Sequence, residues 1–128
     1  MSLLEDFKPF NFSEGVPYVS VTINGVSFNK SVVLKLNYPE YVVLLINEES
    51  KQIAIQVCDR DTPNAVQFYK VKKNPNLISV RWNGRDLINT LQTMMGWSLK
   101  NNGYRVDGVL LKEERAMLFD LNKAEELK

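Results

Sequence analysis

The sequence contains no histidine and only one cysteine among its 128 residues. The absence of histidine excludes Ser-His-Asp and Cys-His catalysis and most zinc sites, because each of these needs an imidazole. The single cysteine, Cys58, excludes an intrachain disulfide and a Cys-x-x-Cys metal knuckle. Neither G-x-G-x-x-G nor G-x-x-x-x-G-K-[ST] occurs, so there is no glycine-rich phosphate cradle. We therefore expect no enzyme, no cofactor and no metal ion.

Long hydrophobic runs and an excess of one charge are also missing. The longest apolar run, Tyr41 to Ile46, is far shorter than the roughly 20 residues of a membrane-spanning helix. The N-terminus lacks the pattern of a signal peptide. Sixteen basic and fifteen acidic residues give a net charge of +1, so no global field favours nucleic acid or an anionic membrane. The composition, 45% hydrophobic and 24% charged, is typical of a soluble globular domain, which we expect in the cytoplasm.

The first half of the chain predicts a strand, a short helix and a hairpin. Apolar side chains alternate with polar ones over 18–23, and Asn24-Gly25 marks a turn. A helix is expected from the N-cap Asn29 or Ser27 to Leu36, where Asn37 and Pro39 stop it. The alternation then predicts an antiparallel hairpin over 41–46 and 53–57.

The second half repeats this order. A strand over 78–82 is followed by Asn83-Gly84, then by a helix from Asp86 to Met95 with Gly96 after its end. Strands over 104–111 and 117–121 complete the unit. Ser20-Val21-x-x-Asn24-Gly25 recurs as Ser79-Val80-x-x-Asn83-Gly84, at an offset of 59 residues. We therefore predict an α+β fold with a small coiled β core or barrel, built from two β-α-β-β repeats with two short helices. Val21 and Val80 are expected to be buried.

This pattern divides one compact domain into five segments. They are an N-terminal arm (1–17), a first β-α-β-β repeat (18–58), a connector (59–76), a second β-α-β-β repeat (77–121) and a polar tail (122–128), which is expected to fray. The arm carries five large apolar side chains, at Leu3, Leu4, Phe7, Phe10 and Phe12. It either packs along its own domain or crosses to a second copy, and the second case predicts a homodimer formed through the arm.

The strand, turn, capped helix and hairpin resemble the swapped-hairpin fold of the AbrB and SpoVT-type bacterial regulators. The residues that carry the resemblance are 19–25, 28–36 and 41–57 in the first half and 78–84, 86–95 and 104–121 in the second. In those proteins two such units interleave into one small barrel, ordinarily as a homodimer. Here both units would lie in one chain, as a covalent pseudo-dimer. The run from Tyr41 to Asp59 also resembles a group of small uncharacterised bacterial proteins, and this second resemblance implies no function.

The resemblance implies binding of double-stranded DNA, and hence transcription regulation, by basic residues of the strand-turn-helix segment. That segment carries only Lys30 in the first half, whereas the second half has Arg81 and Arg85. The stretch from Thr62 to Arg85 contains no acid, so it predicts a phosphate-binding set made of Lys70, Lys72, Lys73, Arg81 and Arg85. Alternatively the lysines only solubilise an exposed connector. The alternative function is a protein–protein interaction or structural module that binds no nucleic acid.

Two other groups of polar residues lead to no functional prediction. Cys58-Asp59-Arg60-Asp61 offers a thiol and two carboxylates, but no further ligand has a recognisable spacing, so we interpret it as the end of a strand and a charged turn. Glu48-Glu49 and Glu113-Glu114 occupy equivalent hairpin turns, where exposed carboxylates are ordinary.

Overall fold

The computed structural model describes residues 3–5, 7, 15–70 and 78–127. Within these residues the fold is mostly antiparallel β, with two short α-helices, and this confirms the prediction of a small α+β fold. The elements are β1 (Tyr18–Thr22), β2 (Gly25–Phe28), α1 (Lys30–Lys35), β3 (Tyr41–Asn47), β4 (Gln52–Val57), β5 (Val66–Gln67), β6 (Val80–Trp82), α2 (Arg85–Met95), β7 (Gly103–Leu111), η1 (Lys112–Glu114), β8 (Ala116–Asp120), η2 (Leu121–Lys123) and β9 (Glu125–Leu127).

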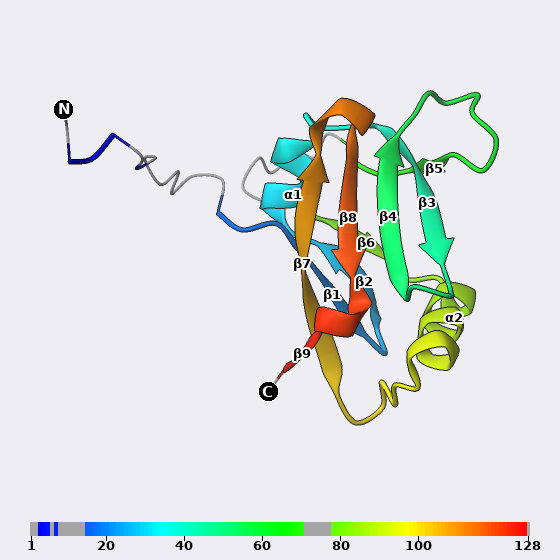
Figure 1. Ribbon diagram of the computed structural model, residues 1–128. Helices are drawn as coiled ribbons and strands as arrows, with labels where there is room; N and C mark the ends of the chain where they lie inside the picture. The colour runs from blue at the N-terminus through cyan, green and yellow to red at the C-terminus, as the bar shows by residue number, and fades with distance from the viewer. Residues whose placement is uncertain (1–2, 6, 8–14, 71–77, 128) are drawn as a thin grey trace.

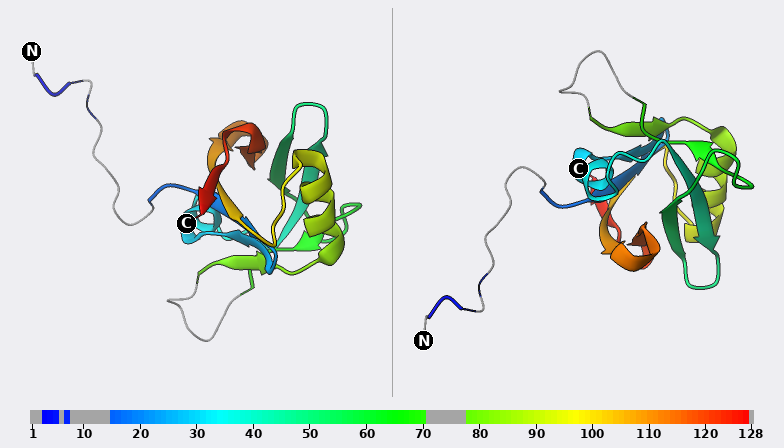
Figure 2. Two further views of the ribbon diagram at one scale, coloured as in Figure 1. Left: turned by 90° about the horizontal axis from the view of Figure 1, so that it is seen from below. Right: turned by 90° about the horizontal axis from the view of Figure 1, so that it is seen from above.

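The strands form one curled sheet in the order β5-β3-β4-β8-β7-β1-β2-β6, and β9 pairs with β7 (Figure 1). The long strand β7 joins the two parts of this sheet. Its residues Tyr104 to Asp107 pair with β1, and its residues Gly108 to Leu111 pair with β8. Viewed from above and below, the sheet curls into a half-barrel, with α1 and α2 on opposite sides of the molecule (Figure 2).

The concave side of the sheet holds the hydrophobic core. Phe28 lies within it, and its ring centroid is 5.3 Å from that of Phe68, 5.0 Å from that of Trp82 and 5.8 Å from that of Phe119. Val21 and Val80 are both buried, as the alternation predicted. The remaining buried hydrophobic residues are Val19, Val26, Val32, Val33, Leu36, Val42, Ile53, Ile55, Ile88, Leu91, Leu99, Val106, Ala116, Met117 and Leu121.

Both predicted helices are confirmed, together with the residues that end them. The Asn29 side chain caps α1 by accepting a hydrogen bond from the Val32 backbone N–H at 3.3 Å. Helix α2 ends at Gly96, whose φ of 69° lies in the left-handed region that favours glycine. Its buried residues, Ile88 and Leu91, follow the apolar spacing of the sequence.

Strands β2 and β9 were not predicted. The sequence was interpreted as a single strand before α1, whereas β1 and β2 form a hairpin there in which Val21 pairs with Val26. Buried Val26 and Phe28 alternate with Ser27 over only four residues, a pattern too short to separate from a helix start. The tail expected to fray instead forms η2 and β9, because β9 satisfies backbone groups along β7.

The extra hairpin changes the order of elements within the predicted repeats. Residues 18–57 run β1-β2-α1-β3-β4, whereas residues 78–121 run β6-α2-β7-η1-β8. The first segment is therefore not the predicted β-α-β-β unit, because it contains one additional strand. Strand β5, which lies within the predicted connector, precedes β6.

The expectation that the N-terminal arm packs along its own domain is wrong for Leu3 and Phe7 but holds for residues 15–17, where Pro17 is buried and the Val16 carbonyl accepts a hydrogen bond from Asn29. The side chain of Leu3 is 96% exposed and that of Phe7 is 73% exposed. Locally, the Phe7 backbone N–H donates to the Leu4 carbonyl at 3.0 Å, so this part of the arm forms its own turn.

Candidate functional site

Three of the five predicted basic residues fall within the described part of the chain. Lys70 is exposed just after β5, Arg81 is exposed on β6, and Arg85 is the first residue of α2. Lys70 and Arg81 line one hollow of about 240 Å³ together with Phe68 and Trp82, so the structure brings these two cations together. The other two predicted residues, Lys72 and Lys73, lie outside the described residues.

Folding brings acids close to this acid-free stretch of sequence. Glu40 lines a second hollow with Lys70, Tyr38 and Tyr69. Asp86 follows Arg85 in the first turn of α2 and is exposed. The positive potential around Lys70 and Arg85 is therefore partly offset, whereas no acid lines the hollow that Arg81 borders.

The side chain of Arg81 lies over the hairpin between β1 and β2. Its Nη2 donates a hydrogen bond to the Asn24 carbonyl oxygen at 3.1 Å, which leaves most of its five N–H donors for other partners. Gly25 makes this close packing possible. Its φ is 150°, and a Cβ added there would lie 2.7 Å from the Trp82 carbonyl oxygen.

The register of the sheet aligns Arg81 with residues that the sequence did not single out. Arg81 pairs with Ser27, Ser27 pairs with Ser20, and Ser20 pairs with Arg105. Because each of them has at least one buried neighbour along its strand, all four side chains point to the outside of the sheet. We call these four residues the arginine–serine row. Strands about 4.8 Å apart separate its two arginines by roughly 14 Å.

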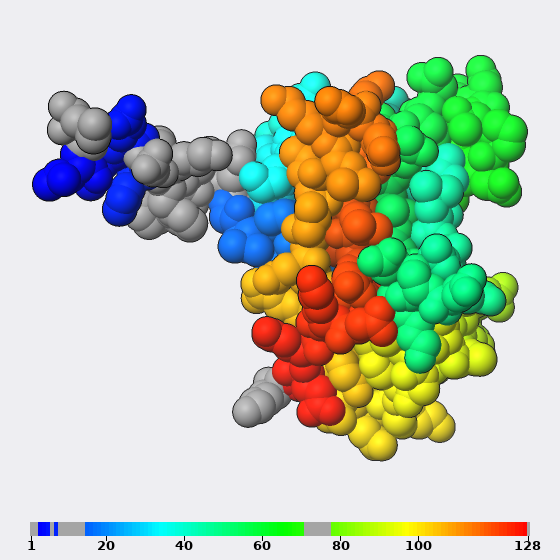
Figure 3. Space-filling model, viewed as in Figure 1, coloured from blue at the N-terminus to red at the C-terminus, as the bar shows by residue number. Residues whose placement is uncertain are grey.

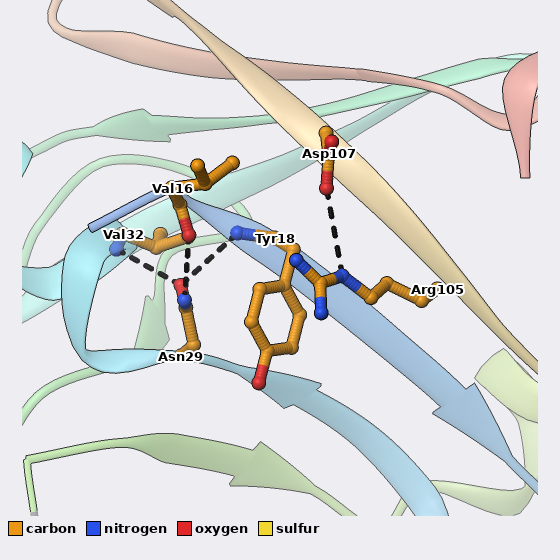
Figure 4. A network of polar contacts seen from close by, with 6 residues as sticks. All are labelled: Val16, Tyr18, Asn29, Val32, Arg105 and Asp107. Atoms are coloured by element: carbon orange, nitrogen blue, oxygen red, sulfur yellow. Dashed lines mark hydrogen bonds and ion pairs between the residues drawn. The ribbon is translucent and has the colours of Figure 1, made fainter. Parts of the chain in front are cut away.

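Arg105 is held at the other end of this row by an aromatic ring and a carboxylate (Figure 4). Its guanidinium carbon lies 3.8 Å from the centroid of the Tyr18 ring, and its Nε lies 3.5 Å from Oδ1 of Asp107. Glu125 of β9 also pairs with Arg105 across the strands. The charge of Arg105 is thus partly balanced, whereas Arg81 forms no ion pair with a described residue.

Asn29 fixes the start of β1 beside this row (Figure 4). Its Oδ1 accepts the Tyr18 backbone N–H at 3.0 Å as well as that of Val32, and its Nδ2 donates to the Val16 carbonyl at 2.8 Å. One amide side chain therefore joins the arm, β1 and α1, and places the Tyr18 ring under Arg105.

Sequence reasoning missed Ser20, Ser27 and Arg105 as members of a common surface. The alternation in 18–22 and in 104–107 already indicates that Ser20 and Arg105 face outward. The pairing of β1 with β7 is what brings them together, and no local pattern predicts it.

The described residues include no group of three or more metal-ligating side chains, and Cys58 is a half-buried free thiol. Every buried side-chain nitrogen or oxygen that the structure describes has a hydrogen-bond partner. No helix in the described residues is long and apolar enough to cross a membrane.

Comparison with known proteins assigns no family or function to the chain. A scan against protein-family models and searches of curated proteins and of solved structures found no match to the chain.

Proposed function

We propose that this chain is a non-enzymatic DNA-binding protein of AbrB-like type that contacts phosphates through the arginine–serine row. The observation that carries the proposal is the register of β7, β1, β2 and β6. It places two hydroxyls between two guanidinium groups on an outward-facing surface, with no acid among the four residues.

The chemistry of this row suits a phosphate backbone. Arginine, serine and threonine side chains supply many of the hydrogen bonds that proteins make to DNA phosphates, and these contacts position the protein without reading sequence. A guanidinium can hold a phosphate by two parallel hydrogen bonds. Because the net charge is only +1, this local concentration of donors has to provide the attraction. We therefore expect weak binding that depends little on DNA sequence.

The strand topology supports the AbrB-like resemblance and an internal duplication. Strand β2 pairs with β6, and each of them leads into a helix. Strand β4 pairs with β8, and each is the second strand of a hairpin. Strand β1 pairs with β7 and β5 pairs with β3, so each half exchanges strands with the other. This correspondence matches β2 with β6, whereas the offset of 59 residues matched β1 with β6.

A cytoplasmic location would follow from DNA binding in a bacterial cell.

A salt titration with a random-sequence DNA duplex tests the proposal. Lys70, Arg81 and Arg105 together predict a log–log salt slope of roughly −3, since each neutralised phosphate contributes about −0.9. Arg81→Gln should weaken binding several-fold at about 50 mM salt and reduce the slope by about 1. Lys112→Gln is the matched control, because it removes one exposed positive charge from η1, away from the row.

Two results would reject DNA binding through this row. One is the absence of a complex at about 50 mM salt with tens of micromolar protein. The other is an equal loss of affinity in Arg81→Gln and Lys112→Gln, because a nonspecific charge effect does not distinguish the two positions.

A protein–protein interaction module is the second candidate function. It is favoured by a separate observation, an uncovered apolar surface on the other part of the sheet. Such a surface would bind a protein and would need no nucleic acid.

A further inference from the structure

The outer face of β3, β4, β8 and β7 carries a continuous row of apolar side chains. Across these strands Leu45 pairs with Ala54, Ala54 with Leu118, and Leu118 with Val109. All four side chains point away from the core, because the residues beside them on β4 and β8 are buried. Leu45 is 45% exposed and Val109 is 60% exposed. We call these four residues the apolar row.

A second row runs beside the first; it holds three apolar residues and one glutamine, and its Ala116 is buried. Val43 pairs with Gln56, Gln56 with Ala116, and Ala116 with Leu111. An antiparallel sheet with one solvated face normally presents polar residues on that face, as Gln52, Gln56 and Asp120 do here. The exposed Leu45 and Val109 depart from this pattern, and exposed apolar residues that lie together mark a candidate interaction surface.

No described helix or strand of the chain provides the outer cover. In Figure 1 the broad faces of β7, β8, β4 and β3 lie at the front of the molecule, and both α-helices lie beside the sheet. The space-filling view from the same direction shows this surface open (Figure 3).

Charged residues of both signs border the apolar row at one end. Val109 and Leu118 line a hollow of about 460 Å³ together with Arg105, Asp107, Asp120, Lys123 and Glu125. An apolar centre with a charged rim is the usual anatomy of a protein interface. A rim with both signs also fits a second copy, because in a twofold dimer the acids of one copy can face the bases of the other.

The area of this face alone is too small for a stable dimer interface. Four strands about 4.8 Å apart and two rows about 7 Å apart cover roughly 250–300 Å². A standard specific interface buries about 800 Å² on each partner. The exposed N-terminal arm can supply the difference, since one aromatic side chain alone can bury about 150–250 Å². Leu3 and Phe7 of the arm are almost fully exposed in the single chain.

The arm joins the body at the edge of the same face. The Gly108 backbone N–H donates to the Pro17 carbonyl at 2.8 Å, so the chain passes into β1 directly beside Val109. The eight peptide units from Phe7 to Gly15 can span at most about 28 Å. This reach is long enough to cross a dimer interface.

We infer that the outer face of β3, β4, β8 and β7 docks a second copy of the chain, and that each copy lays its N-terminal arm against the apolar row of the other. The assembly is a twofold homodimer. The core of its interface consists of the apolar row and the N-terminal arm of each copy. The assembly needs no DNA, and of the arginine–serine row only Arg105 lies at its rim.

Analytical ultracentrifugation without nucleic acid tests the assembly. At tens of micromolar concentration, the mass measured by sedimentation should be twice the 14.7 kDa of the single chain. Val109→Lys combined with Leu118→Lys should raise the dissociation constant at least tenfold, and so should Leu3→Ser combined with Phe7→Ser. Ile23→Lys is the matched control, because Ile23 is a similarly exposed apolar residue in the turn between β1 and β2 and should leave the dimer intact. A near-ultraviolet circular dichroism spectrum like that of the wild type shows that each variant is folded.

Cross-linking distinguishes arm exchange from an arm folded on its own chain. In a Cys58→Ser background, a chain carrying Phe7→Cys is mixed with a chain carrying Val109→Cys and mildly oxidised. Arm exchange predicts a disulfide-linked heterodimer in excess of either homodimer, because a disulfide needs Cα atoms within about 7 Å. A monomeric wild type at about 100 µM, a dimer unaffected by the Lys variants, or no excess of heterodimer would each overturn the inference. None of these results bears on DNA binding, which the salt titration tests separately.

Discussion

The two outward faces of the sheet differ in chemistry although one strand contributes to both. Along β7 the outward residues Arg105 and Asp107 lie beside Ser20 and Tyr18 of β1, whereas Val109 and Leu111 lie beside Leu118 and Ala116 of β8. The change from polar to apolar occurs at Gly108, where β7 leaves β1 and joins β8. The same fold therefore carries, side by side, a polar surface that we propose binds phosphates and an apolar surface that we propose binds a second copy.

The largest effect on stability is expected from placing a charge on the buried side of β1 rather than on its outward side. Val21→Asp places a carboxylate in the core, which costs several kcal/mol against a total stability of about 5–15 kcal/mol. Ser20→Asp, at the neighbouring outward position, should cost only about 1 kcal/mol. Soluble expression and urea unfolding measure both variants. A Val21→Asp protein that melts like the wild type would show that β1 does not separate the core from the outer face.

The next effect concerns the point on β7 where the two faces meet. A Cβ added at Gly108 would lie 2.8 Å from the Phe119 ring and 2.9 Å from the Met117 side chain, both of which are buried. Gly108→Ala should therefore destabilise the protein by about 1–3 kcal/mol through overpacking. Val109→Ala faces outward and should cost less, as urea unfolding at low micromolar concentration would show. Equal stability of the two variants would contradict the assignment of Gly108 to the core side.

The smallest effect concerns a carboxylate at the rim of the apolar face. The side-chain hydrogen bond from Asn122 is the largest cause that lowers the pKa of Asp120 below 3.8. A lowered pKa in the folded state stabilises the protein above the unfolded pKa, and this contribution is lost as the pH falls through the folded value. Asn122→Ala should raise the Asp120 titration midpoint seen by carboxyl NMR toward 3.8. An unchanged midpoint would show that Asn122 does not set it.

The local elements of the fold could be predicted from the sequence, because they depend on neighbouring residues. The Asn29 cap, the left-handed Gly96 and the alternation around Val21 are each readable within a few positions. The pairing of strands is not readable in this way, since it depends on contacts between distant segments. For this reason the sequence identified Arg81 but not its alignment with Ser27 and Ser20. It also could not show that Leu45 and Val109 belong to one surface.

A single NMR titration tests most directly whether DNA binds to the arginine–serine row and leaves the apolar row free. A ¹⁵N-labelled chain is titrated with a random-sequence DNA duplex at about 50 mM salt, and the amide shifts are mapped on the sheet. We predict that the shifts concentrate at Ser20, Ser27, Arg81 and Arg105 and leave Leu45, Ala54, Leu118 and Val109 unchanged. Shifts concentrated on the apolar row, or no shifts on either face, would contradict the proposal that the arginine–serine row binds DNA.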